Sequence, residues 1–222
     1  MALETNLNCY WWEAAPPRPA TLLPWQDATD IAIIGGGFTG LSAALTLARA
    51  GRNVVVLEKG LIGEGASTRN GGITSGNIRL SADQLKRRFG AARAQAFFDE
   101  AVAARADLDQ FISEEKIDCD YKPCGRLVGL TGSFSADKIN RDNDVFEARY
   151  GISPRFIDKA ELSDYTGSAG YDGGICRSDI GGIQPAKIIH AMARLALAGG
   201  VKTFFATTAL SIKRTTPNIP LR

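Results

Sequence analysis

The feature that most constrains this sequence is a cluster of glycines between two short apolar runs. Residues 30–35 read DIAIIG and residues 54–58 read VVVLE, and between them Gly35, Gly37 and Gly40 have the spacing GxGxxG. The two apolar runs predict buried parallel strands, and the apolar positions between them recur at helical spacing. The segment therefore predicts a βαβ unit with a right-handed crossover.

Each glycine of this pattern has a distinct role at a dinucleotide site. Gly35 permits the tight turn, Gly37 leaves room for a pyrophosphate, and Gly40 lets the helix pack close to the strand. The helix N-terminus then presents free N–H groups and partial positive charge to the phosphates. Glu58, at the end of the second strand, is placed to accept hydrogen bonds from ribose hydroxyls, and its charge disfavours NADP. The alternative is a structural glycine turn beside an incidental glutamate.

The choice between NAD and FAD depends on the loop at residues 60–77. A nicotinamide-binding domain would continue with further βαβ units, whereas this chain continues GLIGEGASTRNGGITSG, with six glycines. Such a loop can follow an extended cofactor and bring N–H groups to a pyrophosphate or a flavin ring, and Arg69 adds a positive charge. A flexible linker is the alternative. The loop favours FAD.

The remaining pattern predicts an α/β domain interrupted by part of a second layer. Helices are expected at 91–115, in the short segment KAELSDY, and after Pro185, which is placed to open a helix. Strands are expected in GRLVGLTG, ISPRFID and VKTFFATTALSIKR, and a turn-rich β segment in DGGICRSDIGGIQP. The expected divisions are an N-terminal arm at 1–29, an FAD-binding domain at 30–80 and 161–213, a helical connection with a partial substrate domain at 81–160, and an unstructured or aberrant tail at 214–222.

The predicted arm, residues 1–29, combines four prolines with all three tryptophans of the chain. Proline at this density opposes regular structure, whereas tryptophan side chains favour burial. An extended arm lying across the folded body satisfies both tendencies. An aromatic lid over a substrate site is the alternative.

Composition argues against several other classes of protein. The 26 basic and 24 acidic side chains leave a formal charge of +2, without the basic block typical of nucleic-acid binding. No apolar run approaches the roughly 20 residues that span a bilayer. The first residues lack the basic start and apolar core of a secretory signal. We therefore expect a cytoplasmic protein with no nucleic-acid partner and no membrane span.

Cysteine and histidine usage predicts no metal site. The four cysteines are scattered without a CxxC pair, and His190 is the single histidine. Unpaired thiols fit a reducing cytoplasm. His190 falls on a predicted helix and is interpreted as structural. No catalytic residue is predicted, and the oligomeric state stays open.

Residues 30–76 resemble the start of the D-amino-acid-oxidase-type (DAO) FAD-dependent oxidoreductases. The motif GASTRNGG, at 65–72, is similar to the GASGRNGG of the gamma-glutamylputrescine oxidoreductase branch of that family. The stretch IDCDYKPCGRLV, at 117–128, resembles the link between the long helix and the first substrate-domain strand. The aromatic arm and GGIQPAKI, at 181–188, fit the same branch. The resemblance extends over about residues 8–213.

This resemblance implies a Rossmann-like FAD-binding domain with tightly bound FAD, joined to a mixed α+β substrate domain. It assigns the pyrophosphate to the glycine turn, the ribose to Glu58, the path toward the flavin to the loop, and the adenine to a strand near TTALSI. The residues implied are Gly35, Gly37, Phe38, Thr39, Gly40, Glu58, Lys59, Ala66, Ser67, Arg69, Asn70, Gly71, Gly72 and Ala209, the last standing where the family usually has valine.

The resemblance also implies a reaction. Family members oxidise the C–N bond of an amine to an imine, which water hydrolyses, and pass the electrons to oxygen or another acceptor. A small amine resembling gamma-glutamylputrescine is the expected substrate. An amino-acid oxidase or dehydrogenase acting on glycine, sarcosine or a D-amino acid is one alternative. A non-catalytic FAD-binding fragment is another, because family members continue beyond this length and the chain resembles a C-terminally truncated member.

Overall fold

The computed structural model describes residues 8–18, 24–25, 27–76 and 78–213. Part of the predicted arm and the tail predicted at 214–222 lie outside these ranges. None of the helices within them is long and apolar enough to cross a lipid bilayer.

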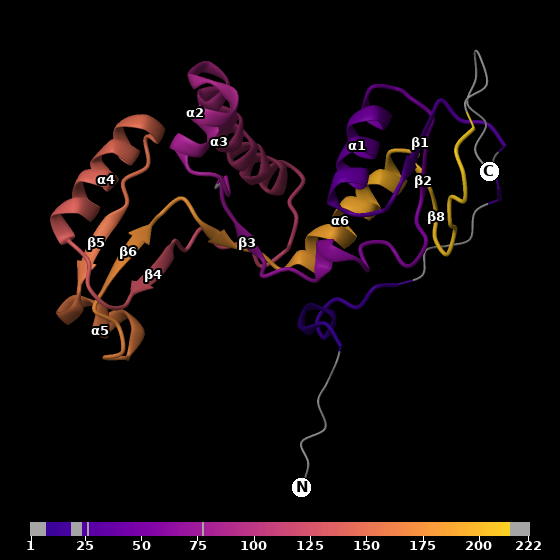
Figure 1. Ribbon diagram of the computed structural model, residues 1–222. Helices are drawn as coiled ribbons and strands as arrows, with labels where there is room; N and C mark the ends of the chain where they lie inside the picture. Colours follow the sequence, from indigo (N-terminus) through magenta and orange to yellow (C-terminus); the bar gives the residue numbers. More distant parts are fainter. Residues whose placement is uncertain (1–7, 19–23, 26, 77, 214–222) are drawn as a thin grey trace, which may run out of the picture. The chain divides into compact units, whose positions relative to one another are not determined.

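The chain folds into two compact units, whose elements Figure 1 shows. Unit 1 comprises residues 1–72 and 184–222, and unit 2 comprises residues 73–183. Unit 2 is thus inserted between the two halves of unit 1. Its bounds differ from the predicted divisions, because residues 73–80 and 161–183 belong to unit 2 rather than to the nucleotide domain.

Unit 1 is built on a parallel sheet with the strand order β1-β2-β8. The strands are β1 (Ile31–Ile34), β2 (Val54–Leu57) and β8 (Lys202–Phe204). Helix α1 (Phe38–Arg49) connects β1 to β2, and helix α6 (Pro185–Ala198) leads into β8 and packs against α1. The predicted βαβ unit is confirmed, and so is the helix opened by Pro185.

The middle strand of this sheet is buried along its whole length. No residue of β2 is more than 4 % exposed. Val55 and Leu57 point to the same face because side chains alternate along a strand, and they form a cluster with Phe204 of β8. The ring of Trp25 lies 5.1 Å from that of Phe204. The continuous apolar run of β2 is therefore explained by burial on both faces.

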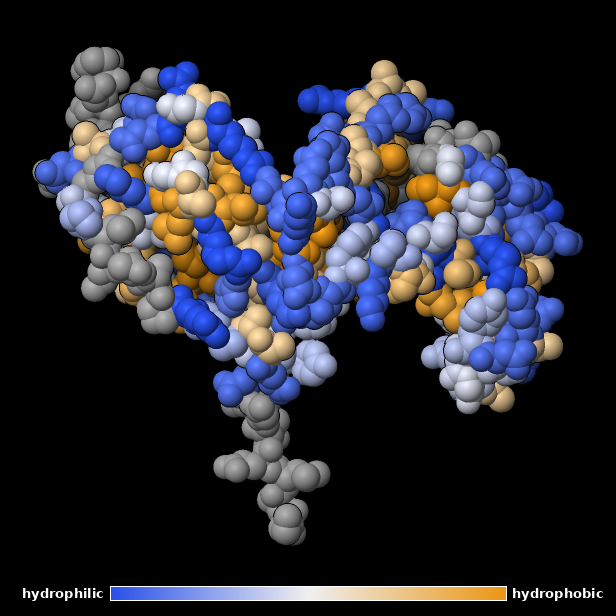
Figure 2. All heavy atoms as spheres, turned by 180° about the vertical axis from the view of Figure 1, so that it is seen from behind, coloured by the Kyte–Doolittle hydropathy of each residue, from blue (hydrophilic) through white to orange (hydrophobic). Residues whose placement is uncertain are grey.

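Apolar side chains also remain at the surface of unit 1, where Figure 2 shows them as orange atoms. Ile34, at the end of the edge strand β1, is 54 % exposed. Beyond β8, Leu210 and Ile212 are 84 % and 61 % exposed. The edge strand β1 and the segment after β8 are thus less completely covered than β2.

Unit 2 contains two antiparallel sheets. In the larger sheet β6 (Gly173–Arg177) lies between β4 (Arg126–Leu130) and β5 (Arg155–Asp158). In the smaller sheet β3 (Ile73–Thr74) pairs with β7 (Gly181–Gly182). These pairings bring the segment around β6 and β7 into unit 2, which the local sequence pattern does not reveal.

Four helices of unit 2 lie within the described residues. They are α2 (Ala82–Phe89), α3 (Ala91–Glu114), α4 (Ala136–Tyr150) and α5 (Lys159–Thr166). Helices α3 and α5 confirm the predicted ones, whereas α2 and α4 were not predicted. A capping box formed by Ser81 and Gln84 begins α2, a signal that the sequence does contain.

The close approach of Gly40 to the backbone of Gly35 predicts that a side chain at position 40 would destabilise the protein. A Cβ atom there would lie 1.9 Å from the carbonyl oxygen of Gly35, which is backbone and cannot rotate away. We expect Gly40→Ala to destabilise the protein by about 3 kcal/mol, measured by chemical denaturation followed by circular dichroism.

Gly65→Ala is the matched control, because a Cβ at Gly65 would meet nothing within 4 Å. Its effect is expected to stay within about 0.5 kcal/mol. Equal stability of the two variants would contradict the close helix–strand packing assigned to Gly40.

Candidate dinucleotide-binding site

The glycine turn between β1 and α1 has the geometry that its spacing predicts. Gly35 has a φ of +103°, a conformation that residues with a side chain rarely adopt. Besides the oxygen of Gly35, a Cβ at Gly40 would meet the side chain of Ile33 on β1 at 3.3 Å. The turn conformation of Gly35 and the close packing permitted by Gly40 are therefore both present in the structure.

The amino end of α1 offers backbone donors at this turn. Gly37 is the N-cap residue and has no side chain that could accept a hydrogen bond. The N–H groups of Thr39 and Gly40 donate to none of the described residues, and the first turn of α1 has no acidic residue. Free N–H groups and the positive end of the helix dipole make this end of α1 suited to an anion.

Glu58 lies beside the glycine turn, at the end of β2. Its Oε2 accepts a hydrogen bond from the N–H of Gly36 at 2.7 Å, and its Oε1 accepts one from Gly60 at 2.9 Å. These bonds fix the carboxylate. Each oxygen keeps further acceptor capacity, so the group can still bind the hydroxyls of a ribose.

The loop after β2 also contacts the amino end of α1. Ser67 Oγ accepts a hydrogen bond from the N–H of Phe38, the first residue of the helix, at 3.0 Å. A Cβ at Gly37 would lie 2.7 Å from the same hydroxyl oxygen. The absence of a side chain at Gly37 therefore lets the loop approach the turn, in addition to the role predicted for it.

Asn70 stabilises this loop around a short 3-10 helix, η2 (Ala66–Thr68). Its side-chain amide donates to the carbonyl oxygens of Ala66 and Ser67 at 3.2 and 2.9 Å. Its Oδ1 accepts from the N–H of Gly72 at 2.8 Å. A flexible linker would not have such a network, so the loop is an ordered part of the site.

The aromatic arm packs on the same loop. The indole N–H of Trp12 donates to Thr68 Oγ1 at 2.9 Å, and that hydroxyl donates to the carbonyl oxygen of Gly63 at 2.7 Å. The guanidinium carbon of Arg69 lies 4.4 Å from the ring centroid of Trp12. The indole N–H of Trp11 donates to the carbonyl oxygen of Asn70 at 2.7 Å. These contacts support packing of the arm rather than a lid.

The structure thus brings together three of the predicted groups: the glycine turn, Glu58, and Ser67 with its neighbours in the loop. Arg69 and Asn70 form contacts within the loop and with the arm. Lys59 and Gly71 are exposed, Ala209 is half-buried five residues beyond the end of β8, and none of these three is hydrogen-bonded to the turn. Their contact with a cofactor stays a prediction.

The contacts that the loop forms with the helix and with the arm were not predicted from the sequence. The hydrogen bond from Phe38 to Ser67 joins residues 29 apart, and that from Trp12 to Thr68 joins residues 56 apart. The composition of the loop and the tryptophans of the arm were visible signals, but nothing local pairs one with the other.

His190 lies on α6, beside a separate cavity of about 370 Å³ that α6 and the arm line in unit 1. Burial, followed by the positive charges of Arg18 and Arg194, lowers the pKa of His190 below its usual value. Its Nε2 is buried without a hydrogen-bond partner among the described residues. These features fit a neutral, structural histidine.

A parallel βαβ unit with a glycine turn, an uncapped helix end and an acidic strand end defines a Rossmann-like dinucleotide-binding fold. The family described as "DAO: FAD dependent oxidoreductase" matches residues 30–219. The chain therefore belongs to this family, whose cofactor is FAD. The expected family and α/β fold class are confirmed.

Curated relatives resemble nearly all of this chain but extend beyond it. A probable oxidoreductase OrdL from Rhizobium meliloti (strain 1021) is 36 % identical over 207 residues, covering 92 % of this chain and 48 % of the relative. The gamma-glutamylputrescine oxidoreductase of Escherichia coli (strain K12) is 30 % identical over 217 residues, covering 97 % and 50 %. The chain thus spans about half the length of these relatives.

Solved structures share the fold at lower identity. Glycine oxidase from Geobacillus kaustophilus superposes with a TM-score of 0.73 at 22 % identity, covering 87 % of this chain and 50 % of that one. L-Amino acid deaminase from Proteus myxofaciens gives a TM-score of 0.74 at 22 % identity, covering 92 % and 44 %.

The contact between arm and loop predicts the effect of removing one indole N–H. Trp12→Phe keeps an aromatic ring but leaves Thr68, which is 1 % exposed, without this donor. We expect a loss of about 1 kcal/mol in the free energy of unfolding, measured by denaturation followed by circular dichroism.

Trp25→Phe is the control, because Trp25 is 59 % exposed and phenylalanine preserves its ring contact with Phe204. Its effect is expected to be less than about 0.5 kcal/mol. An equal loss in both variants would show that the Trp12 hydrogen bond has no particular role.

Proposed function

We propose that this chain binds FAD in unit 1 and forms the cofactor-binding part of an oxidoreductase that oxidises the C–N bond of a small amine. One observation carries the proposal: the glycine turn, Glu58 and Ser67 meet at the amino end of α1. Each comes from a different segment, and their bonds at 2.7 to 3.0 Å leave the donors of Thr39 and Gly40 free.

The residues present fit FAD. The N–H groups of Thr39 and Gly40 would hold the pyrophosphate, since they are oriented donors without an acceptor among the described residues. Glu58 would accept from the ribose hydroxyls. Ser67 and Asn70 keep the loop beside the turn, ready to follow the remaining length of the cofactor. The chemistry that FAD supplies when bound is acceptance of a hydride equivalent from the carbon next to an amine nitrogen.

The amine class is supported by the relatives. The gamma-glutamylputrescine oxidoreductase of Escherichia coli resembles the chain over 97 % of its length, which favours a small amine of that type. The fold is shared with a glycine oxidase and an L-amino acid deaminase, so oxidation of an amino acid is the second candidate. None of the four cysteines forms a disulfide bond within the described part of the chain. The cytoplasmic location expected from them remains a prediction.

The placement of Glu58 predicts how its charge contributes to FAD binding. Glu58→Gln keeps one carbonyl acceptor but removes the negative charge, so we expect FAD affinity to fall about tenfold to a hundredfold. Quenching of flavin fluorescence on titration of FAD into the purified chain measures the change.

Glu64→Gln is the matched control, because Glu64 accepts its hydrogen bond from the N–H of Leu61 in the loop, at 2.9 Å, rather than from the turn. Its FAD affinity is expected to match the wild type. A chain that remains colourless and takes up no added FAD would contradict the proposed cofactor site altogether.

Reduction of the bound flavin tests the substrate class. The FAD-loaded chain is mixed anaerobically with gamma-glutamylputrescine, putrescine, glycine, sarcosine or D-alanine, and loss of flavin absorbance is followed. We expect gamma-glutamylputrescine to reduce the flavin fastest. Faster reduction by an amino acid would favour the second candidate, and a yellow chain that none of them reduces would contradict oxidation by this chain.

A further inference from the structure

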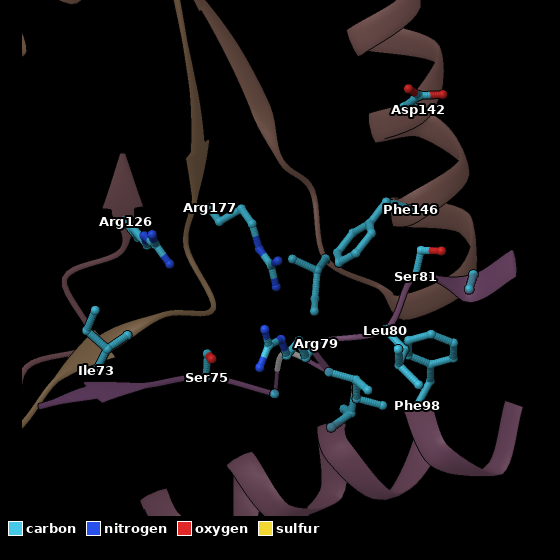
Figure 3. A pocket seen from close by; sticks show the side chains of 15 residues that line it. Ile73, Ser75, Arg79, Leu80, Ser81, Phe98, Arg126, Asp142, Phe146 and Arg177 are labelled. Carbon is cyan, nitrogen blue, oxygen red and sulfur yellow. The ribbon is translucent and has the colours of Figure 1, made fainter. Parts of the chain in front are cut away.

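Unit 2 contains a cavity for which the FAD site gives no use. Its volume is about 870 Å³, within the range of small-molecule sites. The segment after β3, helices α3 and α4, and the adjoining ends of β4 and β6 line it, and all of its lining residues belong to unit 2. Figure 3 shows the side chains that face this space.

Three arginine side chains converge on the cavity from three different segments. Arg79 follows β3, Arg126 begins β4, and Arg177 ends β6. Their guanidinium groups point into the same space in Figure 3. Arg126 and Arg177 are register partners on neighbouring antiparallel strands. Like charges directly opposite each other are unfavourable, so this arrangement costs stability unless an anion offsets it.

Arg177 is fixed in position by its neighbours. Its Nε and Nη2 donate to the two carboxylate oxygens of Asp179 at 2.9 and 2.6 Å. Its guanidinium carbon lies 4.8 Å from the ring centroid of Phe146. The guanidinium group of Arg177 is therefore held rigidly in the wall of the cavity, and the carboxylate of Asp179 balances much of its charge.

Arg79 and Arg126 lack this balance. Neither forms an ion pair with any of the described residues, and both are exposed, so a ligand can reach them. Among the described lining residues the one carboxylate is that of Asp142, which lies on α4 away from the three guanidinium groups in Figure 3. Two positive charges therefore face the cavity without a counterion from the described part of the protein.

The rest of the wall is largely apolar. The apolar lining side chains in this part of the cavity are those of Ile78, Leu80, Phe98, Val102, Phe146 and Ile152. Such a surface favours an aliphatic chain, whereas a small inorganic anion would leave it in contact with water. Arginine in turn matches the two oxygens of a carboxylate with a pair of parallel hydrogen bonds.

We infer that this cavity is a binding site for an aliphatic carboxylate, with the carboxylate between Arg79 and Arg126 and the chain against the apolar wall. The site lies within unit 2 and does not depend on FAD. Asp179 already balances Arg177, so the negative charge of the ligand compensates the charges of Arg79 and Arg126, and binding should also stabilise unit 2.

Hexanoate titrated into the full chain tests this inference, with binding followed by calorimetry and by NMR of the arginine side chains. A Kd on the order of 1 mM is expected for a ligand this small. Arg126→Gln should weaken binding about tenfold, and Arg79→Gln similarly. Arg93→Gln is the matched control, because it removes the same charge from an exposed position on α3 outside the cavity.

The comparison ligands are hexanamide, which lacks the charge, and inorganic phosphate, which lacks the chain. Both should bind at least about tenfold more weakly than hexanoate. Absence of saturable hexanoate binding, or binding that neither arginine variant weakens, would overturn the inference. Phosphate binding as tightly as hexanoate would also overturn it.

Two further measurements separate the possible causes of a failure. Arg126→Gln should unfold at a temperature no lower than the wild type, because Arg126 is exposed and forms no ion pair with the described residues. Weaker hexanoate binding can then not be assigned to misfolding. FAD titrated into the same samples should bind all of these variants equally. Loss of FAD binding without loss of hexanoate binding would count against the proposed function alone.

Discussion

The approach of α1 to β1 is the constraint on which the candidate nucleotide site depends. Gly40 has no side chain, and a Cβ there would collide with the backbone oxygen of Gly35. The absence of that Cβ lets the helix begin close to the end of the strand. In the same turn the N–H of Gly36 donates to Glu58 Oε2 at 2.7 Å, and Glu58 lies at that edge of the sheet because it follows β2 directly. A wider spacing would separate the helix donors from the carboxylate. Both the packing of α1 on β1 and the candidate site therefore require a glycine at position 40.

The loop beyond β2 completes this arrangement because it is held from two directions. On one side Ser67 accepts a hydrogen bond from the first N–H of α1. On the other, Thr68 accepts from Trp12 of the arm and donates its own proton to Gly63. A buried hydroxyl with both roles satisfied stabilises one loop conformation over its alternatives. The arm is thus part of the scaffold of the candidate site, because Trp11 and Trp12 pack on the loop.

An element could be predicted from the sequence where neighbouring residues alone determine its structure. The βαβ unit needs only residues 31–58, and its strands, helix and glycine roles were predicted from spacing. Helix α4 was missed because it is largely polar, with its ends set by Ser135 and Gly151. The membership of β6 in unit 2 was not predicted, because β6 pairs with the strands that begin at Arg126 and Arg155. The residues of β6 alone do not indicate which strands it pairs with.

The two units present positive charge to ligands in different forms. In unit 1 the donors are backbone N–H groups and a helix dipole, whose partial charges are fixed by the fold. In unit 2 the charges are whole guanidinium groups that line a largely apolar cavity. Partial charges can be packed tightly against a polyphosphate, whereas whole charges need either water or a counterion. Arg177 has Asp179 as its counterion, whereas Arg79 and Arg126 have none among the described residues, so a ligand that brings its own negative charge best explains the placement of these two.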